Sequence, residues 1–399
     1  MRWILASALL IFGLVAVGNW TSAKWVLLTL FLYSIPLLLQ WSSKATVRAY
    51  ALWFGIFLVL QTLVTPLVID RDYKTLPPKM VRRIDVIGDA IPGVSGIQRI
   101  TTDENGFRVT EKIDYGAKPT GTFRIFALGG STTEQLILDD QRTWTHLLQE
   151  QIKGLDRYRH VEVINNGVSG TRAIHHLASL KRVMDWDADL VIFLMGLNDW
   201  NRHIWDELGA PQQYKPGVSS NPVQFSESLA GILLKNLTRD PQKYHNERVQ
   251  PVYGAYYSRQ NNSLQRSDIK TFRPETIAAS YRSVVREIAE ACRQNKLSCL
   301  FVSQPTAYHE HSSAALKKYL WMTPPNTEYT LDFQSLIHVA NLYNDFLMDF
   351  AEENDVARCD LAGPFEATLE HLHDDCHFNV LDAQHTAEIL ADCVRRMGL

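Results

Sequence analysis

The sequence predicts an α/β fold in which a parallel sheet is covered by helices on both faces. Short apolar runs alternate with longer segments of helical periodicity through the C-terminal part of the chain. The runs are predominantly apolar, which is typical of strands buried on both faces of a sheet. The predicted strands are 123–128, 161–164, 190–195, 299–302 and a weaker run at 357–361. The predicted helices are 143–152, 276–294, 337–352 and 382–397.

The N-terminal part has a different composition. Three apolar runs without an acidic residue, 3–17, 25–39 and 49–69, are separated by short polar links. The first two are short against the roughly 20 residues that a helix needs to cross a bilayer, and the third is long enough. Tryptophans gather near the ends of these runs, as they do at membrane interfaces. We therefore expect a three-helix transmembrane anchor, residues 1–69, rather than a cleaved signal peptide or a buried bundle.

The remaining chain divides by composition. Residues 70–95 are polar with several prolines and glycines, which predicts a linker, and 96–399 form the predicted globular domain. Within that domain, about 205–273 break the strand–helix alternation and are interpreted as an insertion. We therefore expect a multi-pass protein of the inner or plasma membrane. The basic residues that flank the first runs favour an extracytoplasmic globular domain, although the basic residues after the third run favour a cytoplasmic one.

Charge and cysteine content exclude some classes of protein. A net charge of −3 over 399 residues gives no reason to expect a nucleic-acid partner. The five cysteines form no CxxC pair and no disulfide framework. Cys292 and Cys299 are near enough in sequence to pair in an oxidising compartment, but buried free thiols are the preferred interpretation.

Polar motifs follow the predicted strands, where a parallel sheet binds its ligands. The first strand ends in Gly-Gly-Ser-Thr with Ser131, the second in Asn-Asn-Gly-Val-Ser-Gly ending at Gly170, and the third in Gly-Leu-Asn-Asp with Asn198. Asp-Asp-Cys-His, with Asp374 and His377, precedes the last predicted helix. We expect these residues to meet at one edge of the sheet.

The residue types suit acyl transfer. A serine hydroxyl on a tight turn becomes a nucleophile when a base takes its proton, and His377 can be that base for Ser131. Asp374 can orient the imidazole and stabilise its charged form. The backbone N–H of Ser131, a glycine N–H and the Asn198 amide are suitable donors for the developing oxyanion.

These four motifs, in this order, resemble the SGNH hydrolases, also called the GDSL esterase/lipase superfamily. The resemblance covers about 105–399, includes an Asn-Gly-Phe-Arg stretch at 105–108, and is closest to bacterial, membrane-anchored members with a Gly-Gly-Ser-Thr block. It implies a flavodoxin-like three-layer α/β/α sandwich and a Ser-His-Asp triad. The residues that it implies are Ser131, Asp374 and His377 as the triad and Ser131, Gly170 and Asn198 as the oxyanion hole, with no cofactor and no metal.

The motifs depart from the family pattern at three points. Gly130 precedes the nucleophile where the family name records aspartate. Either Gly167 or Gly170 could be the second oxyanion donor, and spacing favours Gly170. Asp375 lies beside Asp374, and the family's spacing favours Asp374 as the triad acid.

Other interpretations of single motifs compete with the triad. His-Leu-His-Asp-Asp-Cys-His, 371–377, could instead be a metal cluster, although it lacks the usual pair spacing. His309 and His311 have no evident second set of ligands and are expected at the surface or cleft mouth. Trp200 and Trp205 follow the third motif and could line an acyl or sugar pocket or simply pack.

The expected function is hydrolysis of an ester by a serine esterase. The acyl group is expected to be small, such as acetyl, and a cell-envelope glycan or lipid is the substrate class considered. An O-acyltransferase that tailors an envelope polysaccharide would use the same residues, and a non-catalytic membrane scaffold is the third hypothesis. The acyl chain, the alcohol, the oligomeric state and the choice between hydrolysis and transfer stay open.

Overall fold

The computed structural model describes residues 72–153, 158–209, 249–252, 268–320 and 329–398. They belong to one compact unit of the chain, 72–216 with 241–399. The predicted membrane anchor, 1–69, and most of the predicted insertion lie outside the described residues. Among the described helices, none is both long and apolar enough to cross a bilayer.

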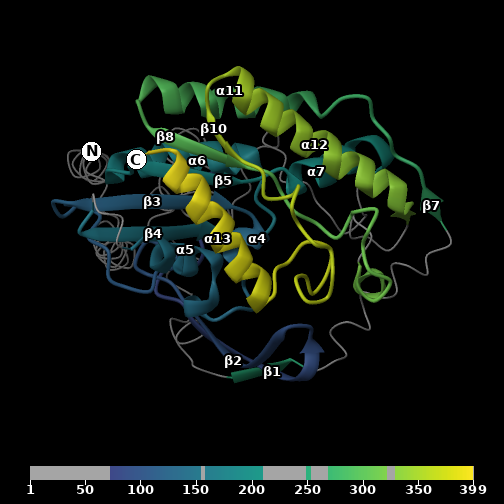
Figure 1. Ribbon diagram of the computed structural model, residues 1–399, viewed down its shortest axis with the longest axis horizontal. Coiled ribbons are helices and arrows are strands. Elements are labelled where there is room, and N and C mark those ends of the chain that lie inside the picture. The colour runs from purple at the N-terminus through teal and green to yellow at the C-terminus, as the bar shows by residue number, and fades with distance from the viewer. Residues whose placement is uncertain (1–71, 154–157, 210–248, 253–267, 321–328, 399) are drawn as a thin grey trace, which may run out of the picture. The chain divides into compact units, whose positions relative to one another are not determined.

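A five-stranded parallel sheet forms the centre of this unit (Figure 1). Its strand order is β10-β8-β5-β3-β4, which is 2-1-3-4-5 when the five strands are numbered along the chain. This is the flavodoxin-like order, so the predicted α/β fold with a parallel sheet is confirmed. The strands are β3 (Thr122–Gly129), β4 (His160–Gly167), β5 (Leu190–Leu194), β8 (Ser298–Val302) and β10 (Ala357–Cys359).

The central strands are buried because helices cover both faces of the sheet. Every residue of β3 and of β5 is buried. Arg124 is the one charged residue in β3, and it is fully buried. Its guanidinium pairs with Glu162 at 2.6 Å across the β3–β4 register, and it donates to the carbonyl groups of Trp186 and Asp114. Such pairing is what permits a charge in this position.

The helices divide between the two faces. Right-handed crossovers place α5 on one face and the helices that follow β4, β5 and β8 on the other, since the strand order reverses after β4. α13 packs on α5, whereas α11 packs on α6. The helices are α4 (Ser131–Glu134), α5 (Trp144–Ile152), α6 (Ala173–Val183), α7 (Leu197–Leu208), α11 (Ala279–Gln294), α12 (Phe333–Glu353) and α13 (Val380–Arg396).

A second, three-stranded sheet corrects the predicted linker. β1 (Val81–Ile91) pairs antiparallel with β2 (Val94–Thr101) and parallel with β6 (Val249–Val252). The backbone N–H of Thr101 donates to Asp140 at 2.9 Å, which ties this sheet to the main domain. The linker interpretation of 70–95 is therefore wrong for β1. The predicted start of the insertion at 205 is also wrong, because it falls inside α7. Two short strands, β7 (Ile269–Lys270) and β9 (Thr330–Leu331), pair separately.

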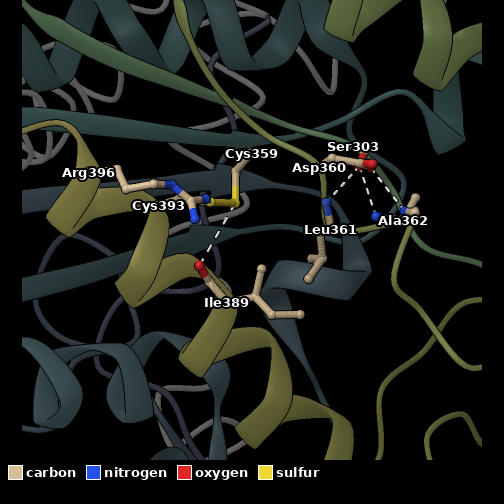
Figure 2. Close-up of a disulfide and its surroundings, with 9 residues drawn as sticks. Ser303, Cys359, Asp360, Leu361, Ala362, Ile389, Cys393 and Arg396 are labelled. Carbon is tan, nitrogen blue, oxygen red and sulfur yellow. Dashed lines mark hydrogen bonds between the residues drawn. A yellow bond between two sulfur atoms is a disulfide. The ribbon is translucent and has the colours of Figure 1, made fainter.

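Two disulfides fasten helices to the sheet. Cys292 at the end of α11 pairs with Cys299 in β8. Cys359 in β10 pairs with Cys393 in α13 (Figure 2). The interpretation of the cysteines as free thiols is thus wrong for these four, while Cys376 is free and buried. Figure 2 also shows Ser303, after β8, accepting from two backbone N–H groups beyond β10.

Candidate active site

Ser131 lies on a sharp turn between β3 and the one-turn helix α4. The backbone N–H groups of Thr133 and Glu134 donate to the Gly130 carbonyl oxygen, which starts the helix directly after the strand. Ser131 itself is partly exposed at the carboxyl end of the sheet. The turn therefore places Ser131 directly after β3, at the carboxyl end of the sheet.

Close packing surrounds the two glycines before Ser131. A Cβ atom on Gly129 would lie 2.0 Å from Thr133 Oγ1, and one on Gly130 would lie 2.8 Å from Asn198 Nδ2. The space beside Gly130 is therefore occupied by the amide expected to serve the oxyanion.

The two candidate glycines after β4 have different surroundings. Gly167 is buried, its N–H already donates to Asn165 Oδ1 at 2.8 Å, and a Cβ there would lie 2.1 Å from the Glu134 backbone nitrogen. Gly170 has open space around its Cα and a φ of +77°. It lines the same cavity as Ser131, and Gly167 does not. The geometry therefore favours Gly170 as the oxyanion donor.

Asn198 stands in the first turn of α7, directly after β5. Its Nδ2 donates to the Thr171 carbonyl oxygen at 2.8 Å, which leaves one amide hydrogen for another acceptor. The neighbouring Asp199 accepts from the Ala173 backbone N–H at 3.0 Å. Burial raises the pKa of Asp199 to about 7. These contacts join the start of α7 to the loop that carries Gly170.

Asp374 and His377 form a hydrogen-bonded pair. Asp374 Oδ2 lies 2.7 Å from His377 Nδ1, and Oδ1 also accepts from the backbone N–H groups of Cys376 and His377. The Asp374 side chain is 1% exposed and that of His377 is 22% exposed. The Asp374 carboxylate therefore fixes the Nδ1 side of the His377 ring.

Charge and burial together set the titration of this pair. Burial disfavours the charged imidazole, but the adjacent Asp374 carboxylate outweighs it and holds the pKa of His377 well above the usual value. Burial likewise opposes the Asp374 charge, yet His377 and the N–H donors keep the pKa of that carboxyl below its usual range. Burial raises the pKa of the neighbouring Cys376 thiol to about 11. Cys376 is therefore a neutral thiol at neutral pH.

One cavity of about 380 Å³ brings the five predicted site residues together. Ser131, Gly170, Asn198, Asp374 and His377 all line it, although they come from four separate segments of the chain. Its other walls combine apolar and basic side chains. These include Leu136, Ile137, Trp205, Phe378, Arg172 and Arg202.

The C-terminal loop, residues 371–379, is held by side chains that sequence reasoning missed. Asn379 is fully buried; its Nδ2 donates to the carbonyl groups of Leu369 and Glu370, and its Oδ1 accepts from two N–H groups of α13. The Tyr308 hydroxyl donates to Asp375. Asp375 therefore helps to hold the loop through its bond to Tyr308.

Arg108 braces the segment that follows Ser131. It is buried, it donates to the carbonyl groups of Glu134, Gln135 and Leu138, and it pairs with Asp140 at 2.8 Å. The Asn-Gly-Phe-Arg stretch, 105–108, entered the sequence analysis only as part of the family resemblance. The signal that could have found its role is an arginine beside an apolar core residue, Phe107.

The remaining aromatic and histidine candidates differ in whether they lie at the cavity. Trp200 is buried in the core against Tyr343, whereas Trp205 lines the cavity. His309 and His311 belong to neither of the two metal-compatible groups found among the described residues.

The metal interpretation of 371–377 has partial geometric support. His373, Asp374 and His377 each offer one ligand atom, and these atoms lie within 4.8 Å of one another. A metal on Nδ1 of His377 would displace the Asp374 hydrogen bond. Burial lowers the pKa of His373 to about 4, so this neighbour is neutral and adds no charge to the pair.

Comparison with known proteins identifies a family whose sequence pattern covers the segments that line the cavity. The sequence pattern of the GDSL-like lipase/acylhydrolase family matches residues 127–381, which include all five candidate site residues. No curated protein sequence matches the chain significantly.

Solved structures that match the chain have low sequence identity to it. A GDSL-like lipase from Bacteroides thetaiotaomicron is 12% identical, over 69% of this chain and 86% of that one, with a TM-score of 0.33. An acetylxylan esterase from Geobacillus stearothermophilus is 12% identical over 69% and 93%, with a TM-score of 0.35. A psychrotrophic esterase from Pseudoalteromonas is 9% identical over 69% and 97%, with a TM-score of 0.34.

The family pattern spans most of the chain and contains the strand-end motifs around which the cavity is built. The chain therefore belongs to the GDSL-like lipase/acylhydrolase family and is a hydrolase of ester bonds.

Proposed function

We propose that this hydrolase is a serine esterase in which Ser131 is the nucleophile, His377 the general base and Asp374 the acid that orients it. The observation that carries the proposal is that Ser131 shares one cavity with a bonded Asp374–His377 pair. Neither the serine nor the histidine would do this chemistry alone, because the hydroxyl needs a base and the base needs a fixed tautomer.

In the first half-reaction, His377 Nε2 takes the proton from Ser131 Oγ as this oxygen attacks the ester carbonyl carbon. The carbonyl oxygen becomes an oxyanion and accepts hydrogen bonds from the Ser131 N–H, the Gly170 N–H and the Asn198 amide. The C–O bond to the alcohol then breaks, and His377 returns its proton to the departing alkoxide. The products are the free alcohol and an acyl-serine.

In the second half-reaction, water attacks the acyl-serine while His377 takes one of its protons. The same donors hold the oxyanion, and the Ser131 oxygen leaves with the proton from His377. A carboxylic acid is released. An O-acyltransferase would differ only in placing a sugar hydroxyl where this water stands.

A small acyl group, such as acetyl, on a cell-envelope glycan or lipid is the substrate class that we propose. A cavity of about 380 Å³ lies at the small end of the range for ligand pockets. Its apolar wall can take a short acyl chain, and Arg172 and Trp205 can contact the alcohol. The two disulfides support an oxidising, extracytoplasmic compartment for this domain, and residues 1–69 remain our proposed membrane anchor.

The test is turnover of p-nitrophenyl acetate and p-nitrophenyl decanoate by the full-length chain and its Ser131→Ala variant. We expect acetate to be preferred and the variant to lose at least about 10³-fold in kcat. Equal turnover by the variant would contradict the assignment. Transfer of labelled acetyl to a glycan instead of water would favour the acyltransferase.

A further inference from the structure

A second cluster of ligating side chains lies outside the proposed triad. His371, Asp382 and His385 each offer one ligand atom, and the three atoms lie within 4.8 Å of one another. His371 begins the C-terminal loop, whereas Asp382 and His385 are one turn apart on α13. The His371 and His385 rings have centroids 5.1 Å apart. Nothing in the esterase chemistry uses these residues.

The buried side chain of Asp382 is a second, independent indication that a cation binds at this cluster. Its side chain is 2% exposed, and Oδ1 contacts His371 Nδ1 at 3.3 Å. Its other oxygen, Oδ2, is buried with no hydrogen-bond partner among the described residues. An unpaired carboxylate oxygen in the interior is costly, and coordination of a cation is one way to satisfy it.

We propose that His371, Asp382 and His385 bind a divalent transition-metal ion of the zinc type. Two imidazoles and one carboxylate are donors that zinc accepts, with water completing a tetrahedron. His385 is partly exposed, which leaves a route for the ion from solvent. Metal–ligand distances of about 2.0–2.2 Å in a tetrahedral site place the donors about 3.4 Å apart, so the three donors must draw closer when the ion binds.

The bound ion would connect the C-terminal loop to α13. The His371 carbonyl oxygen already accepts from the Asn379 N–H at 3.0 Å, at the far end of that loop. A metal held by His371 and α13 would close the base of the loop that carries Asp374 and His377. The ion thus has a structural role at a place distinct from Ser131, although the sequence analysis expected no metal.

The experiment is titration of the full-length chain, after dialysis against a chelator, with Zn²⁺ and separately with Co²⁺. We expect one equivalent to bind, with the intense visible Co²⁺ absorption typical of tetrahedral coordination. His385→Ala should weaken binding at least about 100-fold, since a direct ligand contributes more than an outer-shell partner. Zn²⁺ should raise the Tm of the wild-type chain and not that of His385→Ala.

Matched variants make the outcome decisive. His311→Ala removes an exposed histidine outside both clusters and should leave binding unchanged. Asp382→Asn should weaken binding as His385→Ala does. Unchanged binding in His385→Ala, absence of stoichiometric binding by the wild type, or loss of binding in His377→Ala with retention in His385→Ala would each overturn the proposal.

Discussion

The two sides of the candidate site are held in place by different physical means. On the sheet side, Ser131 stands on a turn whose backbone packs directly against buried glycines such as Gly167. On the opposite side, Asp374 and His377 stand on a loop with a single β-bridge, and hydrogen bonds from side chains such as Asn379 give it its shape.

This difference predicts which kind of substitution should disrupt each side of the site. The sheet side should fail when a side chain is enlarged, because close backbone packing leaves no space for added atoms. The loop side should fail when a polar group is deleted, because buried donors and acceptors then lose their partners. Substitutions on each side test that contrast.

The largest effect is expected from Asp374→Asn on the loop side. An asparagine would favour the wrong imidazole tautomer, and kcat should fall about 10⁴-fold, as in other triads. We expect the activity of the wild type to rise with pH as His377 loses its proton, and the raised pKa of His377 should place this rise above the usual range for histidine. Because the Asp374 carboxylate is the main cause of the raised pKa of His377, the rise in activity should occur at lower pH in the variant.

The measurement is kcat/KM against pH for both proteins. If kcat/KM rises at the same pH in the wild type and in Asp374→Asn, the Asp374 charge does not set the pKa of His377. Unchanged circular dichroism of the variant would confirm that the fold is intact.

On the sheet side, Gly167→Ala should destabilise the fold by about 3 kcal/mol or more, because its Cβ would overlap the Glu134 backbone. Gly170→Ala is the matched control. The added Cβ at position 170 would meet no atom within 4 Å, so this variant should lose only the cost of the positive φ, about 1–2 kcal/mol. Urea unfolding of both variants measures the difference, and equal losses would contradict the packing account.

A smaller effect is expected from Asn379→Ala. The variant loses the N-cap of α13 and the donors to two loop carbonyl groups, at a cost of about 2 kcal/mol. Asn379→Ser keeps an N-cap oxygen and should recover about half of that loss. Chemical denaturation compares the two variants, and identical stability of the alanine and serine variants would mean that capping contributes nothing.

The central sheet and the sheet side of the site could be predicted because their signals are local. Most of the strands contain a short, largely apolar run, and Ser131, Gly170 and Asn198 come soon after three of these runs. The β1–β2 pair was missed because its residues alternate between apolar and polar, and its glycines and prolines suggested a linker.

The supports of the loop side could not be predicted, because their partners are distant in sequence. Tyr308 meets Asp375 across 67 residues, and no local pattern marks either partner. The pairing of Cys359 with Cys393 likewise depends on how β10 meets α13 in space. Short-range motifs therefore indicated which residues are candidates, and only the fold indicated what holds them.

The most direct test of the central claim is to treat the full-length chain with a fluorophosphonate probe and to locate the adduct by peptide mass spectrometry. The account predicts one adduct on Ser131, absent from Ser131→Ala and strongly reduced in His377→Ala. An adduct on another residue, or an active esterase that takes up no probe, would contradict the assignment of Ser131 as the nucleophile.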